Sequence, residues 1–342
     1  MRQARLLQEH GDAFYHCMSR VVDKRFIFKD KEKNYFRKWM RKLEIFCGVE
    51  VVTYCLMSNH FHLLVRVPEP DRIPKLTIDS LLGLLGILYD DTQSLGIRQE
   101  IERAQASGDP KWIEQILARY EQRRGNLATF LKELKQRFTQ WYNRRKGRRG
   151  TLWEDRFKSV IVEGSEAALL TMAAYIDLNP VRAGMVSDPK DYRWCGYAEA
   201  VAGKRRARAG LSAILRHTAY GVNRTVTWAN TSPRYRLLLF GHAIEREADP
   251  QTGTRARRGI SEERIEAEEK RGGKLSIPEI LRCRVRYFCD GAIFGSVEFV
   301  NGIFEAQRWR YGPKRKTGAR KMRGADWGEL RVLRDLRVEP VG

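Results

Sequence analysis

The sequence predicts an α+β fold built on a ferredoxin-like (split βαβ) antiparallel sheet with helices on one side, plus a helical insertion and a helical C-terminal region. The first observation behind this prediction is the order strand, helix, strand, strand over residues 14–67, which is how a split βαβ unit begins. The second is a long amphipathic helical pattern over 126–146, followed by a further β-branched segment at 153–162.

The first strand and helix are expected at residues 14–20 and 31–46. In the helix, bulky apolar residues recur at helical spacing, and Asp30 precedes them as an expected N-cap. Gly48 is expected to end the helix, because glycine tolerates the left-handed conformation that closes many helices.

A hairpin of two strands, 49–56 and 61–67, is expected next, around a tight turn that ends with Asn59. Side chains at i and i+2 of a strand share a face, so His60 and His62 should project together while Phe61 enters the core. Two adjacent imidazoles can bind one divalent metal ion. A pair of ordinary strand histidines is the alternative, and their spacing alone does not decide between the two.

Residues 68–125 are amphipathic in pieces and are expected to form a helical insertion, broken at Gly96 and at 108–110. The helix over 126–146 then runs into a basic hinge. Such a charge run is either a solvated loop or a contact for phosphate. The candidate residues for phosphate contact are Arg144, Arg145, Lys146, Arg148 and Arg149, with Arg156 and Arg182 further along the chain.

A helix expected over 166–178 should end at Asn179-Pro180, because a residue before proline is disfavoured in the α region. Residues at i and i+4 share a helix face, so Tyr175 and Asn179 could bring a nucleophile and a metal ligand to one place. Tyr89 with Gln93 has the same spacing, but it lies in the expected insertion. Tyr175 is therefore the preferred candidate nucleophile.

The expected domains are 1–200, which holds the sheet and the insertion, and 201–260, a linker (Ala, Gly and Arg-rich at 203–210) and a less readable segment. The third is 261–342, a helical and basic region for binding DNA. In this last region, helices at 261–270, 277–287 and 297–309 are expected, with Ser296 capping the third, and a basic tail at 308–337. They could form a helix-turn-helix reader of DNA or a helical appendage that packs on the main domain.

Charge is the strongest compositional signal. The 342 residues include 64 Lys and Arg against 42 Asp and Glu, a formal net charge of +22. Such an excess favours a polyanionic partner, above all nucleic acid. No apolar run is long enough to span a membrane, and the first residues lack a signal-peptide core, so a cytoplasmic, nucleoid-associated protein is expected. The six cysteines show no C-x-x-C spacing and are expected to be reduced thiols.

Three ordered motifs give a more specific signal: Asn59-His60-Phe61-His62-Leu63-Leu64-Val65, the segment 150–157 (GTLWEDRF), and the segment 175–184 (YIDLNPVRAG). Together they resemble the REP-associated tyrosine transposases, single-tyrosine relatives of the HUH transposases. The resemblance covers about residues 13–197. The long segment 68–125 and the extended tail depart from the shorter members of that group.

The resemblance implies a metal-dependent endonuclease and strand transferase that acts on single-stranded hairpin (REP-like) DNA. It implies Tyr175 as the nucleophile that forms a 5′-phosphotyrosine, and His60, His62 and Asn179 as ligands of Mg²⁺ or Mn²⁺. His16 and Asn59 could also approach the site, although a sheet histidine and a turn residue are the simpler interpretations. Trp153 and Phe157 could stack on bases or simply pack in the core. The group is thought to act as monomers, so a monomer is favoured over a dimer.

The sequence leaves two other functions open. The chain could be a metal-dependent nuclease that uses water, with Tyr175 only structural. It could also be a catalytically idle nucleic-acid-binding protein that keeps the fold.

Overall fold

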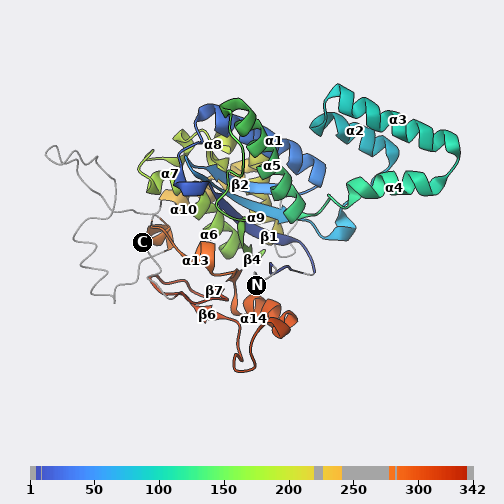
Figure 1. The fold of residues 1–342 in the computed structure, drawn as a ribbon. Coiled ribbons are helices and arrows are strands. Elements are labelled where there is room, and N and C mark those ends of the chain that lie inside the picture. Colours follow the sequence, from blue (N-terminus) through green and yellow to red (C-terminus); the bar gives the residue numbers. More distant parts are fainter. Residues whose placement is uncertain (1–4, 9, 219–225, 241–276, 282, 337–342) are drawn as a thin grey trace, which may run out of the picture.

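A computed structural model describes residues 5–8, 10–218, 226–240, 277–281 and 283–336 (Figure 1). In that part of the chain, seven strands form one mixed sheet in the order β2-β3-β1-β4-β5-β7-β6. They are β1 (Ala13–Arg20), β2 (Glu50–Leu56), β3 (His60–Val67), β4 (Lys158–Val162), β5 (Ile293–Gly295), β6 (Arg320–Lys321) and β7 (Arg331–Val332). The four strands β2-β3-β1-β4 pair antiparallel throughout, in the order of a split βαβ unit. The α+β, ferredoxin-like prediction is confirmed.

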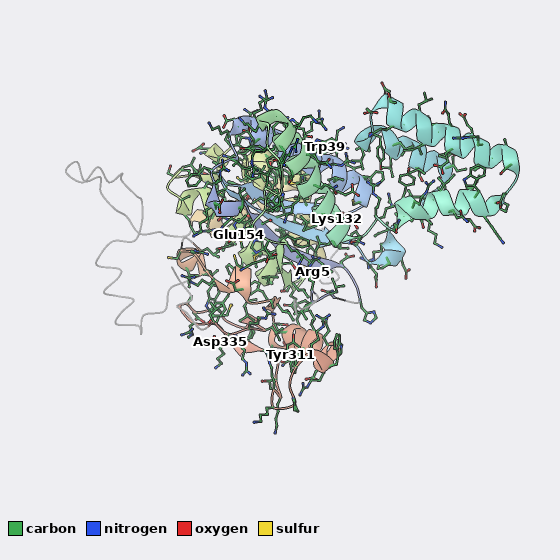
Figure 2. The ribbon with its side chains drawn as sticks, viewed as in Figure 1. Arg5, Trp39, Lys132, Glu154, Tyr311 and Asp335 are labelled. Carbon is green, nitrogen blue, oxygen red and sulfur yellow. The ribbon has the colours of Figure 1, made fainter. Side chains whose placement is uncertain are left out.

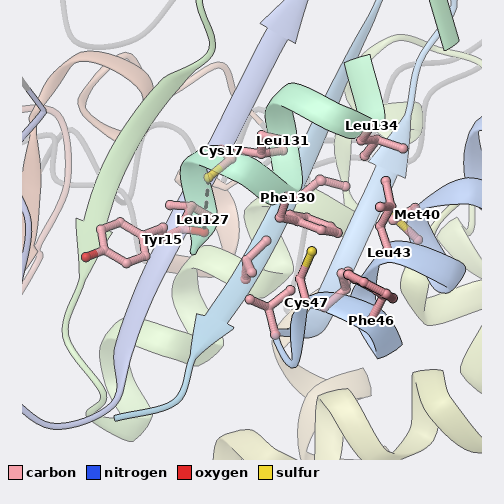
Figure 3. Packing of buried hydrophobic residues seen from close by; sticks show 14 of the residues in the cluster. Tyr15, Cys17, Met40, Leu43, Phe46, Cys47, Leu127, Phe130, Leu131 and Leu134 are labelled. Carbon is pink, nitrogen blue, oxygen red and sulfur yellow. Dashed lines mark hydrogen bonds between the residues drawn. The ribbon is translucent and has the colours of Figure 1, made fainter. Parts of the chain in front are cut away.

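One face of this sheet is covered by α1 (Asp30–Cys47) and α5 (Leu127–Lys146), which lie side by side. Figure 3 shows apolar side chains of the two helices packed together; among the labelled residues are Met40, Leu43 and Phe46 of α1 and Phe130, Leu131 and Leu134 of α5. Gly48 ends α1 in the left-handed conformation, as predicted, with φ at 64°. The predicted cap was wrong: Asp30 is the first helical residue, and Lys29 precedes it without a side-chain cap.

The opposite face is covered as well, which corrects the expectation of helices on one side. Its helices are α6 (Glu166–Asp177), α8 (Gly196–Val201), α9 (Arg205–Thr218) and α10 (Trp228–Phe240). The strands explain this arrangement, since β1 and β3 each carry five consecutive buried residues and are therefore buried on both faces. Residues 203–210, predicted to be a linker, lead into and begin α9, which packs on β2 and α6.

The insertion consists of α2 (Ile78–Leu88), α3 (Asp91–Ser107) and α4 (Pro110–Glu121), which project away from the sheet (Figure 1). The predicted break at 108–110 is confirmed, with Gly108 in the left-handed conformation and Asp109 capping α4. The predicted break at Gly96 was wrong, because α3 continues through it. A single glycine in a helix costs only about 1 kcal/mol relative to alanine, so one glycine alone does not end a helix.

Short helical segments complete the described part of the chain. They are α7 (Asn179–Arg182) and four 3₁₀ turns: η1 (Val22–Lys24), η2 (Pro70–Arg72), η3 (Pro189–Asp191) and η4 (Arg308–Arg310). The expected strand 153–162 is shorter than predicted, since β4 begins at Lys158. Trp153 makes an isolated bridge with Val21 and is buried, as its core interpretation predicts.

The described part of the C-terminal region, residues 277–281 and 283–336, contributes strands to the same sheet and is therefore not purely helical. Its described helices are α12 (Ile277–Ile280), α13 (Tyr287–Asp290) and α14 (Val297–Ala306). The single helix expected over 277–287 was therefore wrong, whereas the Ser296 cap of α14 is confirmed. The strand β5 stands between α13 and α14 and pairs parallel with β4, so the helix-turn-helix interpretation was also wrong. The helix expected at 261–270 lies outside the described residues.

The basic tail is folded from Arg308 to Leu336. It contributes β6 and β7 to the sheet and buries Trp327, Val332 and Leu333. Within the described residues, none of the helices has both the length and the apolarity needed to span a bilayer.

Candidate functional site

Strand alternation places His60 and His62 on the α6 face of β3, whereas Phe61 is fully buried in the α1–α5 core. The two imidazole centroids are 5.0 Å apart, with ring planes at 81°. Across the sheet, His62 pairs with Met18 of β1 and Cys55 of β2. The expected common orientation of the two histidines is thus what the register of the sheet produces.

His16 of β1 joins this pair and fixes the state of His62. The Nδ1 of His16 lies 2.7 Å from the carbonyl oxygen of Phe288, and its Nε2 lies 2.8 Å from Nδ1 of His62. A carbonyl only accepts, so His16 must carry its proton on Nδ1. When His16 is neutral, its Nε2 then accepts from Nδ1–H of His62. The Nε2 lone pair of His62 is left available for a metal ion.

His60 is oriented in the same way by Asn59. The side-chain amide nitrogen of Asn59 donates to the carbonyl oxygen of Lys24 at 2.8 Å, which identifies its Oδ1 as the atom 2.7 Å from Nδ1 of His60. That oxygen accepts from Nδ1–H, so Nε2 of His60 also keeps its lone pair. Asn59 is therefore both a turn residue and a partner that orients His60.

Burial keeps all three imidazoles neutral. Removal from water lowers the pKa of His16 and of His60 to about 4 each, with the neighbouring cations Arg182 and Arg20 adding to the effect for His60. The pKa of His62 is lowered well below its ordinary value, again mainly by burial. Neutral imidazole is the form that binds a metal, so protons do not compete for these nitrogens near neutral pH.

Tyr175 of α6 lies against these histidines. Its ring centroid is 6.2 Å from that of His62 and 6.2 Å from that of His16. The side chain is only 2% exposed, because Phe288 packs edge-on at 4.8 Å and the Arg182 guanidinium lies 4.0 Å from the ring centroid. Burial raises the pKa of Tyr175 above its ordinary value of 10.0, so this phenol is protonated at neutral pH.

Asn179 follows one turn after Tyr175, as predicted. The helix α6 ends at Asp177, and α7 begins at Asn179 after Leu178, which keeps a right-handed helical conformation. Pro180 is thus accommodated near the start of a new turn. The Nδ2 of Asn179 donates to the carbonyl oxygens of Ile176 (3.0 Å) and Tyr175 (3.4 Å). These bonds tie the amide to the end of α6 through its nitrogen.

The residues fit a divalent metal ion in their donor chemistry. No cluster of three His, Cys, Asp or Glu side chains that could hold a metal occurs among the described residues. Both ring nitrogens of His16 form hydrogen bonds, one with the Phe288 carbonyl and one with His62. His16 therefore orients a metal ligand and does not act as one. The available donors are the Nε2 atoms of His60 and His62, and a third would have to be an amide or phosphate oxygen.

The basic candidates fall into two groups. Arg144, Arg145, Lys146, Arg149 and Arg156 are exposed, and Arg148 is partly buried against Asn143. Arg182 differs from all of them. Its guanidinium donates to the carbonyl oxygens of Tyr175 (2.6 Å) and Leu281 (2.7 Å), so it holds α6 and the C-terminal region together beneath the tyrosine.

The two groups that fix the tautomer of His62 differ in how far the sequence predicts them. His16 is a candidate on the first strand, although a sheet histidine is the simpler interpretation. The Phe288 carbonyl that fixes its tautomer shows no signal in the sequence, because any residue offers the same backbone oxygen at any position.

Comparison with known proteins gives one family match. Residues 10–81 match the family model described as "Transposase IS200 like". This segment contains β1, α1, β2 and β3 with both histidines, and it ends before Tyr175. The match confirms the resemblance to transposases over the first of the three motifs. No curated protein matches the chain.

Among solved structures, one described as "Structure of the REP associates tyrosine transposase bound to a REP hairpin" is similar. The sequence identity is 14% and the TM-score 0.38, over 59% of this chain and 87% of that chain. A likeness of this size carries no argument about function.

Proposed function

We propose that the protein is a metal-dependent single-strand DNA endonuclease and strand transferase that acts on hairpin DNA through a 5′-phosphotyrosine at Tyr175. The observation that carries the proposal is the contact of Tyr175 with the oriented imidazole of His62. Their ring centroids are 6.2 Å apart, and the second oriented imidazole, His60, lies 5.0 Å from His62. The match of residues 10–81 to the transposase model and the net charge of +22 support it.

In the proposed reaction, the Tyr175 oxygen attacks the scissile phosphorus as its phenolic proton leaves. The new O–P bond forms while the P–O3′ bond breaks, and the leaving 3′ oxygen takes up a proton. The phosphodiester energy is kept in the tyrosyl link, so a later 3′-hydroxyl can rejoin the strand without ATP. When bound, Mg²⁺ or Mn²⁺ would be held by His60, His62 and Asn179 and would supply Lewis-acid stabilisation of the phosphate charge.

The surrounding residues hold these groups in place. His16 and Asn59 fix the tautomers of the two ligands before any metal arrives. Arg182 places a positive charge against the Tyr175 ring, which favours the phenolate. The proposal also requires movement: at 2% exposure, the Tyr175 ring must come out from beneath Phe288 before DNA can reach its oxygen.

The decisive experiment incubates the protein with a single-stranded hairpin oligonucleotide and Mn²⁺, followed by denaturing electrophoresis. We expect a DNA adduct that survives denaturant in the native protein and is lost in Tyr175→Phe. EDTA should abolish it, as should His60→Ala. Tyr192→Phe is the control, because Tyr192 is a buried tyrosine on the same side of the sheet that bonds Lys33 and the Leu56 carbonyl.

A metal nuclease that uses water is the second candidate, favoured by the burial of Tyr175. It predicts cleavage without an adduct, and unchanged cleavage in Tyr175→Phe. If the protein binds the hairpin but neither cleaves it nor forms an adduct with any metal, the idle binding protein is the correct interpretation.

A further inference from the structure

A pocket of about 380 Å³ lies where the helical insertion meets the core, on the other face of the sheet from the histidines. Its lining comes from α1, from α5 and from residues 88–93, at the junction of α2 and α3. The volume is at the lower end of the range of ~300–1,000 Å³ that is usual for small-ligand sites. It suits a single nucleotide better than a large molecule.

The walls of this junction pocket combine aromatic rings with cations. Tyr35 and Trp141 stack at 4.0 Å with ring planes 10° apart, and Trp39 stands beside them. The Arg137 guanidinium lies 4.5 Å and the Lys42 ammonium 5.2 Å from the Trp39 ring centroid. Tyr35, Trp39 and Trp141 pack against the core but are each only partly buried, so part of each side chain lines the pocket.

The charge of the pocket favours an anion. Its lining includes three cations, Lys42, Arg137 and Arg144, against one carboxylate, Asp90. The Asp90 side chain is engaged as the cap of α3, where it accepts from the Gln93 amide at 2.9 Å. The exposed residues Arg145 and Lys146 continue the positive surface beyond Arg144 along the end of α5.

We propose that the junction pocket binds an unpaired nucleotide of single-stranded DNA, with its base against the Trp39, Trp141 and Tyr35 rings and its phosphate beside Lys42, Arg137 and Arg144. Base-on-aromatic stacking with cations along the backbone is how proteins hold single strands without reading sequence. The site lies across the sheet from Tyr175, so it anchors the strand away from the place of cleavage. The choice of DNA as the nucleic acid rests on the proposed function, whereas the binding itself does not.

The test measures binding alone, with EDTA present so that no metal-dependent chemistry intervenes. The probe is a fluorescein-labelled oligothymidylate of about eight nucleotides, which fits one such site and forms no hairpin. Fluorescence anisotropy gives the dissociation constant of the full-length protein. We expect Trp141→Leu to weaken binding roughly 10-fold, and to reduce the quenching of tryptophan fluorescence by the oligonucleotide.

Arg144→Glu should also weaken binding, and should lower the salt dependence of log K by about 0.7, the value for one lost phosphate contact to a single strand. Lys132→Glu is the matched control, since Lys132 is an exposed cation on the same helix outside the pocket. Figure 2 labels Lys132, and also Trp39 on the side of the core next to the insertion.

The proposal would be overturned if Trp141→Leu and Arg144→Glu bound the oligonucleotide with affinities within twofold of that of Lys132→Glu. Equal affinity of the native protein for duplex and single-stranded DNA would also overturn it. If thermal melting shows that Trp141→Leu does not fold, the comparison of the oligonucleotide affinities of Arg144→Glu and Lys132→Glu decides. Loss of binding in the pocket variants supports the pocket even if no adduct ever forms at Tyr175. Adduct formation with unchanged binding rejects the pocket and keeps the proposed reaction.

Discussion

The two faces of the sheet are built on different principles. The face under α1 and α5 is closed by aromatic and aliphatic packing, with Phe36, Phe61, Phe138 and Trp153 in mutual contact. The face under α6 buries polar groups beside apolar ones, among them His16, His62, Thr53 and Asp177. Each of these polar groups has a specific partner, as a buried polar group requires.

The difference separates stability from chemistry. Apolar packing is tolerant of its partners, so the buried interior of the first face, away from the junction pocket, can be changed at a cost in folding alone. A hydrogen-bonded chain is not tolerant, because every member fixes the proton position of the next. The α6 face thus holds the reactive atoms in one protonation state, and the other face provides the rigidity on which that depends.

The largest expected contrast is between two adjacent residues of β3. Phe61→Ala should lower the free energy of unfolding by about 3–5 kcal/mol, because it empties a fully buried aromatic site. His62→Ala should cost less stability but abolish metal-dependent DNA cleavage. Urea unfolding and the hairpin cleavage assay, both run well below the melting temperature, measure the two effects. A His62→Ala protein that still cleaves would break the division between the faces.

His16→Ala should weaken metal binding by about 10- to 100-fold, the usual effect of losing a residue that orients a ligand. The variant leaves Nδ1 of His62 without its partner and frees the other tautomer. Titration with Mn²⁺, followed by isothermal calorimetry, gives the affinity. His16→Gln, which can still both donate and accept, should recover part of it. Equal affinities for all three proteins would mean that His16 only fills space.

Gly210→Ala tests how tightly α9 is seated on the α6 face. An added Cβ would lie 2.6 Å from the Val52 carbonyl oxygen, so we expect a loss of about 1–3 kcal/mol in the free energy of unfolding. Gly96→Ala in α3 is the matched control. Its Cβ meets nothing within 4 Å, and it should stabilise the protein by about 0.5–1 kcal/mol. Thermal unfolding compares the two, and a tolerated Gly210→Ala would show that α9 can shift.

A pH-dependent effect is expected at Lys135 of α5, whose pKa burial lowers from 10.5 to about 8. Between pH 8 and pH 10.5 the folded state has lost this proton and the unfolded state still binds it, so this residue makes stability rise with pH. Below pH 8 both states bind the proton, so the folded state bears the full free-energy cost of burying the charged amine. Relative to Lys135→Met, the native protein should therefore gain stability through this window, as denaturant titrations at several pH values would show. A constant difference would contradict the assignment.

Much of the fold could be predicted because its signals are local and periodic. The apolar runs of β1 and β3, the apolar stripes of α1 and α5, and the glycine after α1 are each signals within a few residues. The common face of His60 and His62 follows from the alternation of side-chain direction along a strand. Tyr175 and Asn179 came from a helical spacing, and the structure keeps that spacing through the junction of α6 and α7.

The features of the fold that could not be predicted depend on residues distant in sequence or on apolar patterns that neighbouring charged residues obscure. In α9 the arginines at 205, 206 and 208 suggest a solvated linker, yet Ala207, Leu211 and Ile214 form a buried stripe between them. The strand β5 is three residues long, too short for a period to be seen. The bond of His16 to the Phe288 carbonyl joins residues 272 positions apart and uses a backbone atom.

The pairing of β5 with β4 also bears on how the chain is made. Ile161 lies opposite Ile293, so the outer edge of β4 stays open until more than a hundred further residues have left the ribosome. During that interval the nascent protein presents unpaired backbone donors and acceptors, which invite association with other chains. Closing such a distant contact is slow, since the entropy of the long loop opposes it. We therefore expect chains arrested before residue 293 to need chaperones, whereas completed chains do not.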